Sequence, residues 1–244
     1  MIRNRVRKKL EEYFDIILAI EKVHFLHIGK TGGSAIKFAL KGHQRTKNYV
    51  IHLHEHHFRL DNIPKGEKLF FGVRDPVDRF ISAFYSRKRE GKPRYAALWS
   101  EEEKEAFNRF ETPNELALAL SVKDDIVKSE AIRAMRSIAH VKDSYWDWFV
   151  SETYFLERMS DVLFVCEQEN LENDFKRLKD ILSLPKHIEL PKDSYQAHAN
   201  PKDIDKKLES QAVINLKRWY SKDYEFLELL KKSDLIKAGK QVKV

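Results

Sequence analysis

Residues 29–34 have the composition of an anion-binding loop. They read Gly-Lys-Thr-Gly-Gly-Ser and include three of the eight glycines in the chain. Glycine lets backbone N–H groups approach a phosphate closely, and the N-terminus of a following helix adds partial positive charge. Lys30 adds a full charge, while Thr31 and Ser34 add hydroxyl donors. The alternative is a tight strand-to-helix turn whose lysine is merely exposed.

A second segment, residues 70–84, places an arginine at the end of an apolar run and a serine two helical turns later. Arg74 can bind a phosphate through two parallel N–H bonds, and Ser82 can add a hydroxyl donor. The alternative is an arginine that braces the turn by pairing with Asp75 or Asp78.

Four of the ten histidines lie within six residues, at His52, His54, His56 and His57. Alternation at strand period would place the first three on one face. An imidazole has an unperturbed pKa of about 6.5, which suits a general base near neutral pH. Two alternatives stay open. Alternating histidines can chelate a metal, although no cysteine is near, or most of them are ordinary surface or core residues.

These residues need a scaffold of strands and helices to position them. Apolar runs predict strands at 23–28, 48–53, 68–73 and 161–166, and helical spacing predicts helices at 34–42, 76–85, 96–159, 171–184 and 204–230. Asp75 is a good N-cap and Pro76 suits a first helical position. Strands that alternate with helices predict an α/β fold around a mostly parallel sheet. Because both anion segments follow strand ends, we expect them to converge at one sheet edge.

Composition places limits on the class of protein. A length of 244 residues fits one domain, and a net charge of +7 suits an anionic ligand. The lone Cys166 excludes an internal disulfide and a cysteine-based zinc site. No apolar run reaches the roughly 20 residues that span a bilayer, so we expect a cytoplasmic protein. The spacing of apolar residues within 1–20 predicts an amphipathic helix. Peripheral contact of this helix with a membrane is an alternative role for it.

Taken as a pair, the two anion segments resemble those of the PAPS-dependent sulfotransferases, which use 3′-phosphoadenosine 5′-phosphosulfate. Residues 25–34 are similar to the 5′-phosphosulfate loop, in which Lys-Thr-Gly-Gly-Ser/Thr is characteristic. Residues 73–84 are similar to the 3′-phosphate motif, with Arg-Asp-Pro and a serine eight residues after the arginine. The nearest branch is the carbohydrate O-sulfotransferases, including the heparan sulfate 2-O and 6-O enzymes. Gly29 departs from the proline of many relatives.

The resemblance implies a P-loop-like three-layer fold, with a single domain over residues 1–244 and a helical elaboration at 96–159 that forms part of the acceptor cleft. It also implies PAPS as co-substrate, PAP as product and no metal. The residues expected to bind the 5′-phosphosulfate are Lys30, Thr31, Gly32, Gly33 and Ser34. Arg74 and Ser82 are expected to bind the 3′-phosphate, and Lys30 also neutralises the leaving group.

The same resemblance selects a base and an acceptor. The 2-O branch has a His-x-His between its two PAPS motifs, and His52-Leu-His54 matches it, so we predict His54 as base, His52 as its support and His56 as second choice. The expected acceptor is a hydroxyl of a saccharide or glycolipid, and no nucleic-acid partner is expected. The segment Gln196–Asn200 resembles a late family segment near the nucleotide; a plain surface loop is the alternative.

Two other functions compete with this one. A P-loop kinase or NTPase would need G-x-x-x-x-G-K-[ST], but its first glycine falls on His24 within a strand. A non-catalytic module that binds nucleic acid or acidic glycans in a basic cleft would leave the placement of the glycines and Arg74 unexplained.

Overall fold

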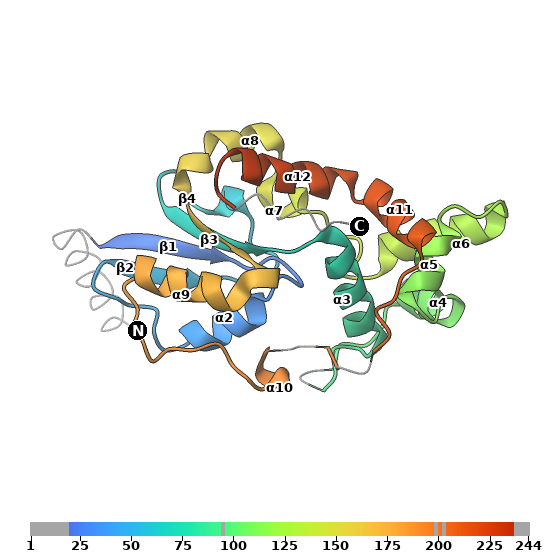
Figure 1. The fold of residues 1–244 in the computed structure, drawn as a ribbon, viewed down its shortest axis with the longest axis horizontal. Helices are drawn as coiled ribbons and strands as arrows, with labels where there is room; N and C mark the ends of the chain where they lie inside the picture. The colour runs from blue at the N-terminus through green and yellow to red at the C-terminus, as the bar shows by residue number, and fades with distance from the viewer. Residues whose placement is uncertain (1–19, 94–95, 198–199, 202–203, 237–244) are drawn as a thin grey trace, which may run out of the picture.

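A four-stranded parallel sheet forms the centre of the computed structural model, which describes residues 20–93, 96–197, 200–201 and 204–236. Its strands are β1 (Glu21–Leu26), β2 (Tyr49–Leu53), β3 (Lys68–Val73) and β4 (Val162–Glu167). They lie in the order β2-β1-β3-β4, and every neighbouring pair is parallel (Figure 1). The predicted α/β fold is therefore confirmed, with strand ends within two residues of those expected.

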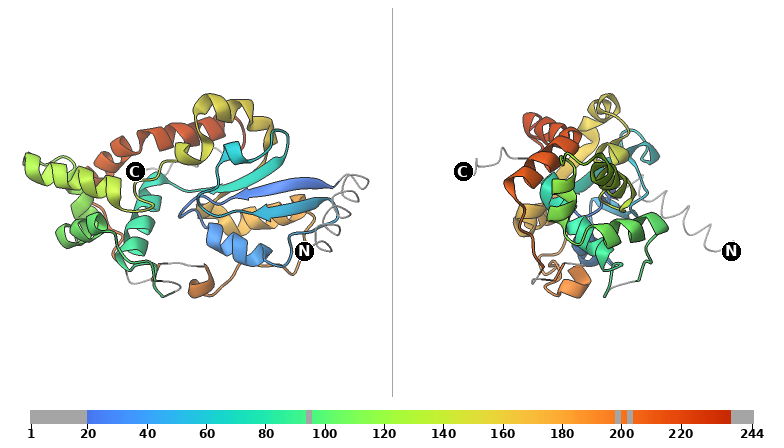
Figure 2. Two further views of the ribbon diagram at one scale, coloured as in Figure 1. Left: turned by 180° about the vertical axis from the view of Figure 1, so that it is seen from behind. Right: turned by 90° about the vertical axis from the view of Figure 1, so that its right-hand side faces the viewer.

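Helices cover both faces of the sheet, which gives three layers (Figures 1 and 2). One face carries α2 (Gly33–Leu40) and α9 (Leu171–Ile181), and the other carries α7 (Trp146–Phe149), α8 (Glu152–Glu157) and α12 (Ser221–Lys232). Each face has its own apolar core, because the buried strands alternate their side chains between the two.

A third apolar core holds a helical part at one end of the sheet. Its helices are α3 (Pro76–Lys88), α4 (Glu101–Arg109), α5 (Pro113–Ala119), α6 (Asp125–Ser137) and α11 (Ser210–Trp219). The helix predicted at 204–230 is in fact two, because α11 begins at Ser210 and the chain breaks at Tyr220 before α12. The loop predicted at 186–203 contains a short α10 (Ser194–Ala197). Three short 3-10 turns, η1 (Leu60–Asn62), η2 (Met159–Asp161) and η3 (Gln168–Asn170), complete the described elements.

The start of α3 follows its sequence signal. The Asp75 carboxylate accepts hydrogen bonds from the backbone N–H groups of Val77 and Asp78, at 2.8 and 3.3 Å, and Pro76 opens the helix. Tyr224 of α12 donates its hydroxyl to the same carboxylate. The turn after β3 is thereby fixed beside the loop after β1, because the two strands are neighbours.

The amphipathic helix predicted for residues 1–20 falls, apart from residue 20, outside the described residues. Among those described, no helix combines the length and apolar character needed to cross a bilayer.

Candidate active site

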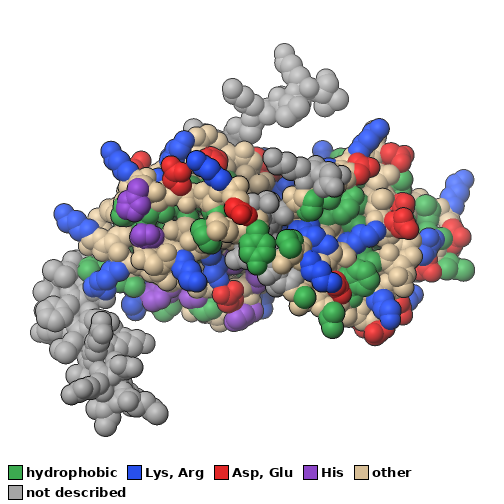
Figure 3. Space-filling view, turned by 90° about the horizontal axis from the view of Figure 1, so that it is seen from below, with side chains coloured by type: hydrophobic (Ala, Val, Ile, Leu, Met, Phe, Trp, Pro, Cys, Tyr) green, Lys and Arg blue, Asp and Glu red, His purple; other side chains and the backbone are tan. Residues whose placement is uncertain are grey.

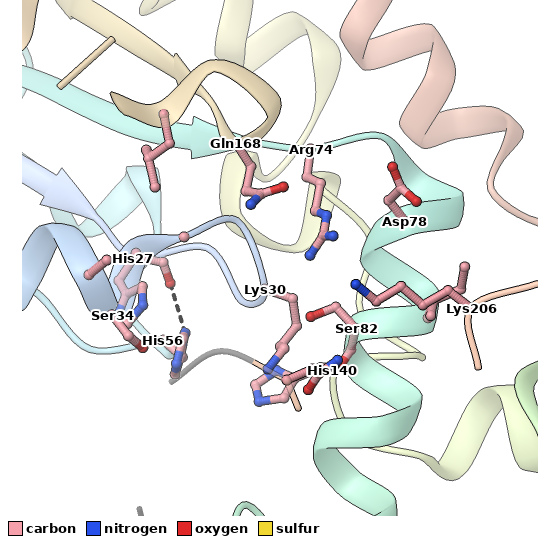
Figure 4. A pocket seen from close by; sticks show the side chains of 16 residues that line it. His27, Lys30, Ser34, His56, Arg74, Asp78, Ser82, His140, Gln168 and Lys206 are labelled. Carbon is pink, nitrogen blue, oxygen red and sulfur yellow. Dashed lines mark hydrogen bonds between the residues drawn. The ribbon is translucent and has the colours of Figure 1, made fainter. Parts of the chain in front are cut away.

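The two anion segments line one pocket of about 290 Å³ at the carboxyl edge of the sheet (Figure 4). Lys30, Gly32, Gly33 and Ser34 come from the first segment, and Arg74 and Ser82 from the second. The other lining residues are His27, Ala35, His56, Asp78, Ile81, His140, Gln168, Leu171, Asn200 and Lys206. The structure therefore brings together residues more than forty positions apart, as their places after β1 and β3 led us to expect.

Close packing explains why this loop needs glycine. Gly32 has a φ of 84°, in the left-handed region, and a Cβ on Gly33 would lie 2.2 Å from Cδ2 of His27. Gly72 of the neighbouring strand β3 is also packed closely against the loop, since a Cβ on Gly72 would lie 2.8 Å from the carbonyl oxygen of Thr31. No larger residue could occupy these positions without moving the loop.

Thr31, which was expected to bind the 5′-phosphosulfate, does not line the pocket. Its side chain is buried and its hydroxyl donates to the carbonyl oxygen of Ile28 at 3.0 Å. The hydroxyl expected to face a ligand therefore braces the loop from within, and Ser34 supplies the loop hydroxyl at the pocket wall.

Arg74 is fixed by its backbone and carries an unsatisfied side-chain donor. Its backbone N–H donates to the Tyr145 hydroxyl at 2.8 Å, and that hydroxyl donates back to the Arg74 carbonyl at 2.7 Å. Arg74 Nε is buried and has no hydrogen-bond partner among the described residues. A buried N–H without a partner costs about 1–3 kcal/mol, so an anionic ligand in this pocket would remove that cost.

A buried arginine ties the loop after β1 to the rest of the site. Arg79 donates from Nε to the Gly29 carbonyl at 3.2 Å and from Nη2 to the Asp143 carbonyl at 2.7 Å. Its Nη1 pairs with the Asp223 carboxylate at 3.1 Å, and both side chains are at most 2% exposed. The guanidinium therefore holds three segments that are remote in sequence.

Substitution of Arg79 by leucine is expected to lower the free energy of unfolding by about 3–5 kcal/mol, because Asp223 is left buried and unpaired. Urea denaturation measures this loss. The double variant Arg79→Leu/Asp223→Leu should recover part of it, since no isolated charge remains. A matched control, Arg133→Leu, removes an exposed partner of Glu105 and should cost about 1 kcal/mol or less. Equal losses for both arginines would contradict the bracing role.

The pocket is electropositive, and this perturbs its lysine. Burial, the largest cause, and the nearby charges of Arg89 and Arg74 together lower the pKa of Lys30 to about 7. Lys206 adds another cation to the wall, and Asp78 is the one acidic residue among the described residues that line it. An anion in the pocket would favour the protonated amine and raise that pKa again.

Binding of PAP at pH 8 is therefore expected to take up close to one proton. Below pH 7 the free protein already carries the Lys30 proton, whereas above pH 7 the proton must come from solvent, so affinity should fall by up to about tenfold per pH unit. Calorimetric titrations in buffers of different ionisation enthalpy measure the uptake. The variant Lys30→Met should abolish it, and wild-type binding at pH 8 without proton uptake would contradict the assignment.

His52 and His54 do not line this pocket. Both rings stack on His24, with centroids 4.9 and 5.1 Å away. His24 donates from Nε2 to the Glu67 carboxylate at 2.6 Å, so its Nδ1 accepts from Nε2 of His54 at 2.8 Å. This relay directs the His54 Nε2 proton to His24 on the internal strand β1, and His54 does not line the pocket that contains Lys30.

His56 lies in the pocket instead, because β2 ends at Leu53 and the alternation expected to continue to residue 56 stops there. Its Nδ1 donates to the His27 carbonyl at 3.0 Å, and Nε1 of Trp148 donates to the His56 carbonyl at 2.8 Å. The first bond fixes the tautomer and leaves Nε2 as an acceptor. Burial, the first cause, and the neighbouring His140 and Lys30 lower its pKa to about 4, so the imidazole is neutral near pH 7.

Sequence reasoning missed several residues of the pocket. His140, Lys206 and Gln168 come from segments with no local motif, so nothing in their own neighbourhood identifies them. Asn200, from the segment expected near the nucleotide, lines the pocket, whereas His198 of the same segment is outside the described residues. Among the described residues, no cluster of three histidine, cysteine or acidic side chains is arranged to hold a metal.

The comparisons with known proteins gave one match. A family model described as the sulfotransferase family matches residues 16–229 of the 244. The match spans the sheet, both anion segments and the helices of the pocket. No curated protein and no solved structure matches the chain.

Proposed function

Because this chain belongs to the sulfotransferase family, its reaction class is sulfuryl transfer, and we propose that it transfers the sulfuryl group of PAPS to a hydroxyl of a carbohydrate. One observation carries the proposal most directly: Lys30 and the unsatisfied Nε of Arg74 lie on the same pocket. A nucleotide with phosphates at both its 3′ and 5′ positions has the charge distribution that two separate cationic elements would select.

The residues of each segment have distinct parts in binding. Lys30 and Ser34, with the backbone at Gly32 and Gly33, hold the 5′-phosphosulfate, and Arg74 with Ser82 holds the 3′-phosphate. Lys206 lies on the same wall and adds positive charge. Bound PAPS supplies the sulfuryl group, and its transfer requires no metal.

The transfer exchanges one sulfur–oxygen bond for another. The acceptor oxygen forms a bond to sulfur while the bond from sulfur to the 5′-phosphate oxygen breaks, and the electron pair stays with that oxygen. Lys30 neutralises the charge that develops on the phosphate. The acceptor hydroxyl gives its proton to a histidine, which acts as the general base.

We assign the base to His56, the second choice from the sequence, ahead of His54. His56 offers a neutral Nε2 with its tautomer fixed, whereas the His54 Nε2 donates to His24. His56 and Lys30 also line the same pocket, which supports this assignment.

The acceptor is proposed to be a hydroxyl-bearing saccharide or glycolipid. The described part of the pocket wall near Lys30 includes the imidazoles of His27, His56 and His140, which can hydrogen-bond a polyhydroxylated ligand. His140 comes from residues 96–159, and through it this helical part contributes to the proposed acceptor cleft.

Incubation with radiolabelled PAPS and a panel of monosaccharides, oligosaccharides and glycolipids tests the proposal. We expect label in at least one saccharide-containing acceptor and an equal amount of PAP. Thermal shifts with PAP and with ATP–Mg²⁺ run beside it, and PAP at about 100 times its Kd should stabilise by about 2.7 kcal/mol. Stabilisation by ATP–Mg²⁺ alone, with no transfer to any acceptor, would contradict the proposal in favour of an NTPase.

A further inference from the structure

His140 occupies the pocket in an unusual backbone conformation. Its φ is 64°, in the left-handed region that residues other than glycine seldom adopt. Lys30, with a φ of 67°, is the other non-glycine residue of the pocket wall in this region. Such conformations persist where the surrounding structure holds them, and they concentrate at functional sites.

A carboxylate lies beside the ring of His140, whose buried Nδ1 has no hydrogen-bond partner among the described residues. Nδ1 lies 3.5 Å from Oδ2 of Asp143, and the two side chains are 20% and 26% exposed. Burial acts to raise the pKa of Asp143, but its pairing with His140 and the charges of Arg79 and Lys142 lower it overall. The Asp143 carboxylate is therefore charged. Because Nδ1 faces this carboxylate, Nε2 is the nitrogen left for the pocket.

The loop that carries Lys30 is shaped to admit this ring. A Cβ on Gly29 would lie 2.7 Å from Nδ1 of His140, so any side chain there would displace the imidazole. The Gly29 carbonyl is itself fixed by Arg79, which also holds the backbone of Asp143. One guanidinium thus sets the spacing between the loop and the imidazole.

The ring lies beside the two residues proposed to act on the sulfuryl group. It meets His56 edge to face at 5.3 Å between centroids, and it contacts the residue that precedes Lys30. Figure 4 shows His140 with Lys30 and His56 on the side of the pocket away from Arg74. The proposed base and the cation of the leaving group therefore flank it.

We propose that His140, supported by Asp143, binds the oxygens of the sulfuryl group during transfer, an inference that rests on the proposed function. In the bound state Nε2 of His140 carries a hydrogen and donates it to a sulfuryl oxygen, Nδ1 faces the Asp143 carboxylate, and Lys30 acts on the bridging phosphate oxygen. PAPS carries the sulfuryl group and PAP does not. Loss of His140 must therefore weaken PAPS binding selectively, whereas a bracing role for His140 would affect the two nucleotides equally.

The variant His140→Asn tests this, because asparagine tolerates the left-handed backbone and removes only the imidazole. Calorimetric titration without acceptor measures its affinities for PAPS and for PAP. We expect about 10- to 100-fold weaker PAPS binding, a change of roughly threefold or less for PAP, and about 10²-fold lower kcat. Gly29→Ala should show the same selectivity, since its methyl group displaces the ring. The control His187→Asn removes an exposed histidine outside the pocket and should leave both affinities unchanged.

The outcomes separate this inference from the proposed function. Equal losses for PAPS and PAP, or none for either, would overturn the role of His140 while the sulfotransferase assignment stands. Wild-type protein that binds neither nucleotide would overturn the proposed function itself.

Discussion

Replacement of His56 by glutamine is expected to lower kcat for sulfuryl transfer by about 10²–10⁴-fold, the usual contribution of a general base. The affinity for PAP should change little, because PAP has no proton to transfer. The loss follows from geometry: the His56 Nδ1–H bond to the His27 carbonyl presents Nε2 as a neutral acceptor, and glutamine cannot take up a proton in its place. Steady-state kinetics with radiolabelled PAPS measures the effect.

The matched control is His54→Gln, which changes the other candidate base. His54 donates to His24, and His24 donates to Glu67, so the substitution disturbs this hydrogen-bonded relay and not the pocket. We expect it to retain most of the activity that His56→Gln loses. A large loss of kcat at His54 together with normal turnover at His56 would restore the base that the sequence pattern favoured.

Replacement of Lys30 by methionine is expected to lower kcat by about 10²–10³-fold, the cost of removing one donor aimed at developing charge. Methionine has an unbranched side chain of similar length, and the backbone stays in the same left-handed conformation. The loss of charge is therefore the main change. PAP binding should weaken as well, because the product carries the phosphate that Lys30 contacts. Kinetics and calorimetry on the same preparation give both quantities.

Lys37→Met is the control for that substitution. Lys37 lies on α2, donates to the His54 carbonyl and pairs with Glu55, and it does not line the pocket. Its loss removes a positive charge from the same part of the molecule and should leave turnover within about threefold of wild type, as expected for a partly exposed ion pair. Equal effects of the two lysines would mean that general charge, not the placement of Lys30, supports transfer.

The fold was predictable from the sequence because its signals are local. Each strand is a short apolar run that ends at glycine, arginine or a polar residue, and Asp75-Pro76 marks the start of α3 within a few residues of chain. The break between α11 and α12 was missed, because residues 204–230 keep a helical apolar spacing across Tyr220.

The candidate site was only partly predictable, for a physical reason. The glycine loop and the segment from Arg74 to Ser82 are contiguous motifs, and adjacent parallel strands bring them together. The histidine favoured as base from the sequence does not line the pocket. The expected strand alternation was extended past Leu53, where β2 ends. The position of His140 in the pocket depends on packing against Gly29, which is more than one hundred residues away in the sequence. No local sequence pattern indicates such a contact.

The central claim is that two separate elements hold the two ends of one nucleotide, and a comparison of PAP with adenosine 5′-phosphate tests it most directly. Calorimetric Kd values are needed for wild type and for Arg74→Ala. We predict that wild type prefers PAP by about 10- to 100-fold, from charge-assisted bonds to the 3′-phosphate. Arg74→Ala should bind both nucleotides with the wild-type affinity for adenosine 5′-phosphate. No preference for PAP in wild type, or equal weakening of both nucleotides in the variant, would contradict the account.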